Sequence, residues 1–198
     1  VSHDLRTPLT RMKLQLAMLK PQNGIAELQQ DVAEMEHMIE GYLAFAKGEG
    51  GETGVVTDIG QLLETVLSDA RRTDDTRDIT LKGAAGCMLL LRPKAVKRCL
   101  DNLVSNSLRY GNKVEISLEL AETAIFVHID DDGPGIPPDK RQDVLRPFVR
   151  LEESRNQDTG GVGLGLTIAR DIARGHGGDL LLADSQLGGL RATVRLPR

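Results

Sequence analysis

Apolar residues at heptad spacing fill the first part of the chain and restrict how it can fold. They extend over residues 5–19 in steps of 4, 3, 4 and 3 positions, and over residues 25–46 in steps that alternate between 3 and 4. This spacing places the apolar side chains along one stripe of a helix, which then packs against another helix. Residues 21–24, Pro-Gln-Asn-Gly, are typical of a turn. The pattern therefore predicts an antiparallel helical hairpin over residues 1–47.

Such a hairpin leaves much of each stripe in contact with water. Pairing two hairpins into a four-helix bundle buries the stripes, so we expect a homodimer. The alternative is that the stripes pack against the rest of the same chain. The glycine-rich residues 48–54 cannot sustain a helix, and we interpret them as a linker to a second domain, residues 55–198.

The second domain has alternating signals of helix and strand. We expect helices over residues 60–72, 93–110 and 164–174, and strands over residues 79–82, 88–91, 114–120, 124–130, 179–184 and 190–196. Asp58 has the residue type of a helix N-cap, Pro93 favours a helix start and Gly111 a helix end. The fold class is therefore α+β, a helical hairpin followed by a layered α/β domain with a mixed sheet.

The composition argues against several classes of function. The chain has 25 Lys and Arg against 29 Asp and Glu, and 3% aromatic residues, which argues against a nucleic-acid binder. Its longest purely apolar run, residues 87–91, is far shorter than the ~20 residues of a membrane helix, so we expect a soluble chain. Cys87 and Cys99 are too few for a disulfide framework and are expected to be core side chains.

Three consecutive acids, Asp130, Asp131 and Asp132, follow a predicted strand and precede Gly133 and Gly135. A carboxylate at a strand end can accept a hydrogen bond from an adenine amino group, and glycines let a ligand approach the backbone. The alternative is a calcium loop. An EF-hand-like loop needs spaced ligands and a terminal Glu, and neither occurs here.

A glycine-rich segment, residues 160–166, precedes the predicted helix at 164–174. Free backbone N–H groups at a helix start can bind phosphate. The segment matches neither the Walker nor the Rossmann pattern, and it is also compatible with an ordinary turn.

On the helix at 93–110, Asn102 and Asn106 are four positions apart and share one face. They are candidates for a hydrated Mg²⁺ that bridges phosphates, or else two satisfied core amides.

Near the start of the chain, His3 and Thr7 lie one helical turn apart on the outer face of the first predicted helix. Asp4 is next to them, and Pro8 is expected to bend the helix because it lacks a backbone N–H. An exposed histidine is usually just a solvated side chain, so this cluster by itself is a weak signal.

Taken together, these segments resemble the conserved boxes of sensor histidine kinases, in the order of that family. Residues 2–10 resemble the H box, 131–135 the G1 box, 146–148 the F box and 161–166 the G2 box. Residues 102–106, together with Arg109 and Tyr110, resemble the N box. The H box and the F-box region look most like those of the enterobacterial osmosensor kinases. The resemblance implies a dimerisation and phosphotransfer hairpin, followed by an α/β sandwich of the gyrase–Hsp90–kinase–MutL type that binds ATP and Mg²⁺.

The resemblance also implies roles for single residues. His3 would receive the γ-phosphoryl group, Asp4 would act as base or orient the imidazole, and Thr7 would serve phosphatase activity. Asn106 would bind Mg²⁺, and Asp131 would bind the adenine amino group. Other expected nucleotide contacts are Asn102, Arg109, Tyr110, Gly133, Gly135, Phe148, Gly161, Gly163, Gly165 and Leu166.

Residues 137–160 would form a lid with Phe148 as its apolar latch and Gly160 and Gly161 as hinges. Further candidate phosphate contacts, which are equally compatible with solvated surface charges, are Arg109, Arg146, Arg150 and Arg155. Asp130 has no role implied by the family. The histidines outside the boxes are expected to be structural; they are His37, His128 and His176.

The expected function is ATP-dependent phosphorylation of His3, followed by phosphotransfer to an aspartate of a response regulator, with phospho-regulator phosphatase activity. One alternative is an ATPase conformational switch of the Hsp90 or MutL kind, and another is a scaffold with a degenerate ATP site. The chain begins two residues before His3, so we expect it to be the cytoplasmic portion of a bacterial inner-membrane receptor, attached through upstream segments.

Overall fold

The computed structural model describes residues 52–73, 76–83, 86–149 and 163–198, together with single residues between positions 11 and 35. Those single residues are helical, in agreement with the two heptad runs. The remainder of the expected hairpin, with His3, Asp4 and Thr7, lies outside the described residues, as does Gly161.

The described elements follow one another in the order strand, helix, two strands, helix, two strands, short helix, helix and two strands. They are β1 (Val55–Asp58), α3 (Ile59–Thr73), β2 (Asp78–Lys82), β3 (Met88–Leu91), α4 (Pro93–Tyr110), β4 (Lys113–Leu120), β5 (Ala124–Asp131), the 3-10 helix η1 (Pro138–Lys140), α5 (Gly165–Gly175), β6 (Asp179–Asp184) and β7 (Leu190–Pro197).

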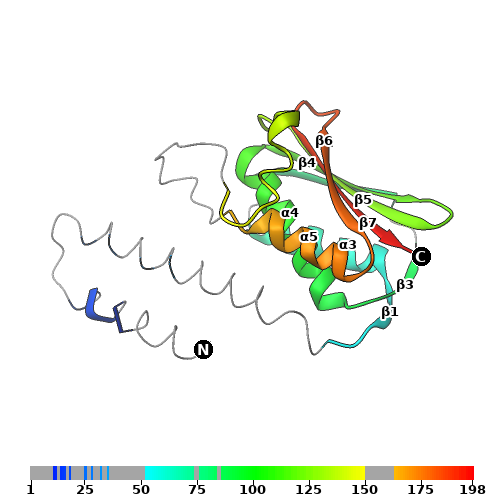
Figure 1. The fold of residues 1–198 in the computed structure, drawn as a ribbon, viewed down its shortest axis with the longest axis horizontal. Coiled ribbons are helices and arrows are strands. Elements are labelled where there is room, and N and C mark those ends of the chain that lie inside the picture. The colour runs from blue at the N-terminus through cyan, green and yellow to red at the C-terminus, as the bar shows by residue number, and fades with distance from the viewer. Residues whose placement is uncertain are drawn as a thin grey trace.

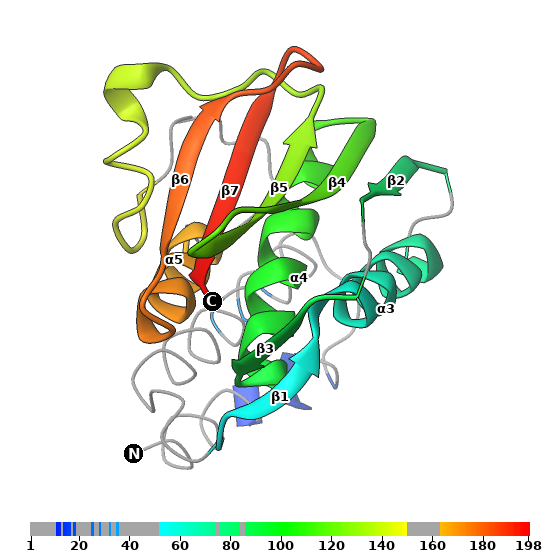
Figure 2. The ribbon, with the colours of Figure 1, turned by 90° about the vertical axis from the view of Figure 1, so that its right-hand side faces the viewer.

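Five strands form one mixed sheet in the order β2-β4-β5-β7-β6. β2 runs parallel to β4, and the other neighbours are antiparallel, which confirms the predicted mixed sheet. The helices lie against one face of this sheet (Figures 1 and 2), so alternate strand residues such as Ile116, Val127 and Ile129 are buried against them. This is the two-layer sandwich that the resemblance implied.

Capping interactions fix the ends of the helices at the predicted places. The Asp58 carboxylate accepts a hydrogen bond from the Gly60 N–H at 2.8 Å, as expected of the N-cap of α3. Gly111 ends α4 by donating its N–H to the Ser107 carbonyl at 2.8 Å. Its φ of −118° is open to any residue. Space favours glycine here, because a Cβ at this position would lie 2.7 Å from Asp132 Oδ1 and would have to displace that carboxylate.

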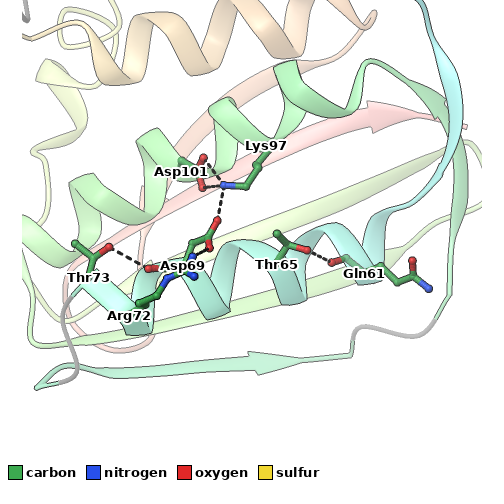
Figure 3. A network of polar contacts seen from close by, with 7 residues as sticks. All are labelled: Gln61, Thr65, Asp69, Arg72, Thr73, Lys97 and Asp101. Carbon is green, nitrogen blue, oxygen red and sulfur yellow. Dashed lines mark hydrogen bonds and ion pairs between the residues drawn. The ribbon is translucent and has the colours of Figure 1, made fainter.

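Helices α3 and α4 are tied together by a polar network on their exposed side (Figure 3). Lys97 of α4 donates to Asp69 of α3 at 2.8 Å and to Asp101 of its own helix at 2.9 Å. The hydrogen bond with Asp69 raises the pKa of the Lys97 ammonium group, which therefore stays charged at neutral pH. Arg72 completes the network by pairing with Asp69.

On the buried side of α4, Cys99 donates its S–H to the Ala169 carbonyl of α5 at 3.4 Å.

Two elements were not expected from the sequence: β1 and η1. β1 has four residues and pairs antiparallel with β3 in a separate two-stranded ribbon, with Val55 opposite Leu91. A strand this short gains its stability from a partner far along the chain, and such pairing has no local signal. The remaining helices and strands of the second domain lie within about two residues of their expected bounds.

Candidate nucleotide-binding site

The buried carboxylate of Asp131 is the centre of the site. Asp131 is the last residue of β5, on the side of the strand that faces the core, and 2% of its surface is exposed. Its Oδ1 accepts two hydrogen bonds, from the N–H groups of Gly133 and Leu190, each at 3.0 Å. No hydrogen bond from the described residues ends on Oδ2. The carboxylate is thus held in one orientation, with one oxygen left to accept a ligand's N–H group.

Close backbone packing surrounds this carboxylate. A Cβ added to Gly133 would lie 3.0 Å from both Asp131 Oδ1 and the Tyr110 carbonyl oxygen. Gly135 has a φ of +70° and its added Cβ would lie 3.4 Å from the Gly189 carbonyl oxygen. Both glycines of the G1 box are therefore needed for space or for backbone conformation.

The turn that contains Gly189 also lines the site, although none of the sequence motifs includes it. The Gly188-Gly189 pair between two expected strands did indicate a turn. Its contact with Asp131 could not be inferred, since it depends on the antiparallel pairing of β5 with β7.

The three consecutive acids do not converge on a common point. Asp130 lies opposite Arg191 on the other face of the sheet and is bound by its Nε at 2.9 Å. Asp132 Oδ1 accepts the N–H groups of Asn112 and Lys113, and the bond from Lys113 lowers the pKa of Asp132. Each carboxylate therefore has its own partners, and the geometry gives no support to a calcium loop.

Helix α4 carries Asn102 and Asn106, both half-buried, toward the start of α5. The Cβ position of Gly165, the first residue of α5, lies 3.9 Å from Asn102 Oδ1. The N-box face and the helix N-terminus expected to bind phosphate are thus adjacent. Arg109 and Tyr110 are exposed at the C-terminal end of α4, about one turn beyond Asn106.

The F and G2 boxes are joined by backbone contacts. The Phe148 N–H donates to the Gly163 carbonyl at 3.1 Å, and an added Cβ on Gly163 would lie 3.0 Å from the Val149 carbonyl oxygen. Thr167 donates its hydroxyl to the Leu145 carbonyl at 3.3 Å. Phe148 has a φ of 64°, an uncommon conformation for a residue other than glycine, and its ring is exposed. Leu166 is half-buried in the first turn of α5.

Other candidate residues have ordinary structural surroundings. Arg146 is largely exposed and pairs with Asp143 at 3.4 Å, so its position gives no support to a phosphate contact. His176 donates from Nδ1 to the Ile172 carbonyl at 2.7 Å and accepts the Arg92 N–H on Nε2 at 3.1 Å, which confirms a structural role.

His128 likewise makes structural contacts, on the outer face of the sheet. Its Nδ1 lies 2.9 Å from the Thr193 hydroxyl and its Nε2 lies 3.2 Å from Glu119. The remaining candidates Arg150, Arg155, Gly160 and His37 lie outside the described residues.

The described residues offer no group of three or more His, Cys, Asp or Glu side chains that could hold a metal ion. A Mg²⁺ bound mainly through nucleotide phosphates and water does not need such a group. The amide oxygen of Asn106 is an oxygen donor of the kind that Mg²⁺ prefers, and the side chain is half-buried beside Asn102. This donor set therefore fits a nucleotide-bound Mg²⁺.

Comparisons with known proteins agree with this geometry. Residues 92–198 match the family described as "Histidine kinase-, DNA gyrase B-, and HSP90-like ATPase", and residues 1–51 match the "His Kinase A (phospho-acceptor) domain". The sensor histidine kinase GtrS of Pseudomonas aeruginosa is 37% identical over 203 residues, which cover 100% of this chain and 41% of GtrS. The chain spans less than half the length of the curated relatives it matches.

Solved structures show the same fold. The ATP binding domain of PrrB from Mycobacterium tuberculosis is 30% identical with a TM-score of 0.62, over 73% of this chain and 96% of that one. The histidine kinase domain of the Escherichia coli osmosensor EnvZ is 31% identical with a TM-score of 0.55, over 73% of this chain and 89% of that one.

None of the helices in the described parts of the chain has the length and apolar character needed to cross a membrane. The two matched families together account for most of the sequence, and they occur in the order that the boxes predicted. The chain belongs to the histidine kinase-, DNA gyrase B- and HSP90-like ATPase family, and it contains the catalytic core of a sensor histidine kinase.

Proposed function

We propose that this chain transfers the γ-phosphoryl group of ATP to His3 and then to an aspartate of a response regulator. The observation that supports it best is the buried Asp131 carboxylate, whose Oδ1 is bound twice by backbone N–H groups while Oδ2 is left for a ligand. An adenine amino group supplies the donor that Oδ2 lacks. The adjacent Asn102 and the N-terminus of α5 then favour phosphates on the same side of the fold.

The transfer itself needs a neutral imidazole at His3. One ring nitrogen attacks the γ-phosphorus, an N–P bond forms, the bond to the bridging oxygen breaks and ADP leaves. Asp4 holds the opposite ring nitrogen and stabilises the positive charge that develops on the ring. Asn106 and the phosphates would hold Mg²⁺, which would neutralise the negative charge of the phosphates. In the second step the phosphoryl group passes from His3 to the regulator's carboxylate.

The proposal extends to the organisation of the chain. We assign residues 1–47 to a dimerising phosphotransfer hairpin, residues 48–54 to a linker and residues 55–198 to the catalytic domain, with the homodimer formed through the hairpin. The curated relatives are more than twice as long as this chain, so we propose that it functions as the cytoplasmic kinase part of a bacterial inner-membrane receptor. A phosphatase activity toward the phospho-regulator is assigned to Thr7.

The test of the nucleotide site compares ATP with inosine triphosphate, which has an oxo group where ATP has an amino group. In Asp131→Asn, the amide oxygen must accept the two backbone N–H groups, so the amide NH₂ takes the place of Oδ2. We expect the affinity for ATP to fall about tenfold or more and the affinity for inosine triphosphate to rise. Calorimetry on both proteins measures this, and an unchanged affinity for ATP would contradict the placement of adenine.

The test of the reaction uses γ-³²P-labelled ATP. A histidine kinase acquires an acid-labile label, and His3→Gln removes that label while nucleotide binding persists. An ATPase switch of the Hsp90 or MutL kind would instead release inorganic phosphate and leave the chain unlabelled. A degenerate scaffold would show no affinity for Mg²⁺ and ATP in the calorimetry.

A further inference from the structure

We propose that the β6–β7 turn, through Gly189 and the N–H of Leu190, determines the selectivity of this site for a 6-aminopurine. The inference rests on the proposed function, in which Asp131 binds adenine. It assigns a positioning role to the β6–β7 turn, which lies outside the H, N, G1, F and G2 boxes.

The turn holds both the backbone and the side chain of Asp131. The Gly189 N–H donates to the Asp131 carbonyl oxygen at 3.1 Å. The next N–H, that of Leu190, donates to the Asp131 Oδ1 at 3.0 Å in a buried contact. Two successive donors thus fix one residue of β5 at two points, so the position of the carboxylate follows the position of the turn.

The turn is itself held rigidly. Ser185 is buried, and its N–H donates to the Gly189 carbonyl at 2.9 Å. Its carbonyl accepts the Gly188 N–H at 3.1 Å, and its hydroxyl accepts the Leu187 N–H at 3.0 Å. These bonds close the segment on itself and leave the donors of Gly189 and Leu190 directed at Asp131.

Only a residue without a side chain fits at position 189. An added Cβ would lie 2.3 Å from Asp131 Oδ1, 2.5 Å from the Gly133 nitrogen and 2.6 Å from the Asp131 carbonyl oxygen. Two of these atoms are backbone and the third belongs to a buried carboxylate, so none can move aside at low cost. Any side chain at this position must push the turn away from Asp131 or rotate the carboxylate.

Selectivity follows from the orientation of the carboxylate. With Oδ1 bound by two N–H groups, Oδ2 presents a fixed acceptor, which attracts a 6-amino group and repels the 6-oxo group of inosine or guanine. A carboxylate freed from the Leu190 N–H can turn and take up water, so it loses this discrimination. A change at the turn is therefore expected to affect the ratio of affinities more than the affinity for purine nucleotides in general.

The experiment measures dissociation constants for ATP and inosine triphosphate in Gly189→Ala and Gly188→Ala. Gly188 has a φ of +106° with nothing within 4 Å of its added Cβ, so Gly188→Ala strains the same turn without touching Asp131. We expect Gly189→Ala to lower the ATP preference about tenfold or more, and Gly188→Ala to lower thermal stability while the preference remains. Equal weakening of both nucleotides in Gly189→Ala, or no weakening, would overturn the inference.

A second pair of variants keeps the test decisive if Gly189→Ala does not fold. Leu190→Pro removes the N–H that Oδ1 accepts, while Leu190→Ala removes the same side-chain packing and retains the N–H. Loss of the ATP preference in Leu190→Pro alone supports the inference, and loss in both or in neither contradicts it. Asp131→Asn, measured in parallel, distinguishes a failure of the role proposed for the turn from a failure of the proposed adenine site. If that variant keeps the ATP preference, the placement of adenine itself is wrong.

Discussion

Three identical side chains at the end of β5 have different surroundings because strand geometry alternates their directions. Asp131 faces the helices and is held by backbone N–H groups, and Asp130 faces the outer side and pairs with Arg191. The hydrogen bond with Asp130 raises the pKa of Arg191, so the guanidinium group stays charged at neutral pH. Asp132 lies beyond the strand, where its carboxylate accepts two N–H groups from the turn between α4 and β4.

The role of Asp132 predicts a pH-dependent loss of stability. Its folded pKa lies below the ordinary value of 3.8, chiefly because of the hydrogen bond from the Lys113 N–H. The stabilisation is therefore fully present above pH 3.8 and is lost as the pH falls through the lowered folded value. We expect Asp132→Ala to reduce the free energy of unfolding at pH 7 by less than about 1 kcal/mol, since the group is exposed.

Urea unfolding of both proteins across a pH series measures this difference, which is expected to shrink toward zero at the acidic end. Asp139→Ala, at an exposed acid of η1, is the control for removal of a surface carboxylate. A difference that stays constant down to the lowest pH would show that the Asp132 carboxylate does not act through its charge.

The position of Asn106 predicts a loss of activity without a loss of fold. Its side chain is half-buried on the same face of α4 as Asn102, and its amide oxygen is the donor assigned to Mg²⁺. Asn106→Ala is expected to abolish labelling of His3 at saturating Mg²⁺ while the far-UV circular dichroism is unchanged. Ser105→Ala, at the exposed neighbouring position, is the control. Normal labelling of Asn106→Ala would remove this residue from the metal site.

At the residue scale, the sequence predicts which residues can bind a ligand better than it predicts which residues contact one another. The acid and glycine pattern of residues 131–135 indicates a ligand site, because a carboxylate can accept a ligand's hydrogen bond and the glycines let the ligand approach the backbone. The second donor to Asp131 comes from Leu190, 59 positions away, and nothing at that residue indicates the contact. The role of Asp130 could not be predicted either. Its partner Arg191 lies opposite it because of the register between β5 and β7, which the sequence does not indicate.

At the scale of elements, the start of α4 depends on a residue outside the helix. The N-cap residue Arg92 makes no side-chain cap bond, and Pro93 has no N–H to satisfy. Glu52, just before β1, supplies the acceptors: Oε1 binds the Lys94 N–H at 2.8 Å and Oε2 binds the Ala95 N–H at 3.0 Å. A carboxylate at a helix N-terminus also interacts favourably with the helix dipole.

This contact predicts local opening of α4 when Glu52 is removed. Glu52→Ala is expected to lower the stability of the first turn by about 1 kcal/mol, because two N–H groups lose their acceptors. Amide hydrogen exchange at Lys94 and Ala95 measures the change, with Glu64→Ala on the exposed side of α3 as the control. Glu52→Gln retains an acceptor oxygen and is expected to show a smaller effect. Unchanged protection in Glu52→Ala would contradict the cap.

The helices of residues 55–198 were predictable because their signals are local. Asp58, Pro93 and Gly111 mark helix ends, and the apolar residues between them have helical spacing. The ribbon of β1 with β3 and the cap by Glu52 were not predictable, because both join segments that are 30 or more positions apart. A helix start that lacks its own side-chain cap was the one available indication that a distant acceptor is needed.

At the scale of the whole molecule, the residues of the proposed reaction are divided between two matched parts. His3 belongs to the phospho-acceptor match at residues 1–51, while Asp131 and Asn106 belong to the ATPase match at residues 92–198. In the proposed reaction, forward transfer needs both parts, since the imidazole of His3 must reach the γ-phosphoryl group of the ATP bound by the second part. The proposed removal of phosphate from a regulator would need a different arrangement, in which the regulator's phosphoaspartate lies against the expected hairpin and a water molecule attacks it.

Thr7 is the residue for which these two reactions are expected to separate. It lies four positions after His3 in the sequence, so in a helix its hydroxyl faces the same outer groove as the imidazole. A hydroxyl there can orient a water molecule toward the phosphoaspartate, whereas forward transfer needs only the imidazole and Asp4. We therefore expect Thr7→Ala to retain labelling of His3 and to lose most of the nucleotide-stimulated dephosphorylation of the regulator.

The competing explanation is that Thr7 only stabilises the helix bend expected at Pro8, and the two explanations predict different pairs of results. A structural role would weaken both reactions together, because altered helix geometry moves His3 as well as the docking groove. The assay therefore follows label appearance on His3 and label loss from purified phospho-regulator with the same protein preparation. Thr7→Ser, which keeps the hydroxyl, is expected to retain both activities. Equal impairment of both reactions in Thr7→Ala would exclude the water-positioning role, because that role predicts a normal forward rate.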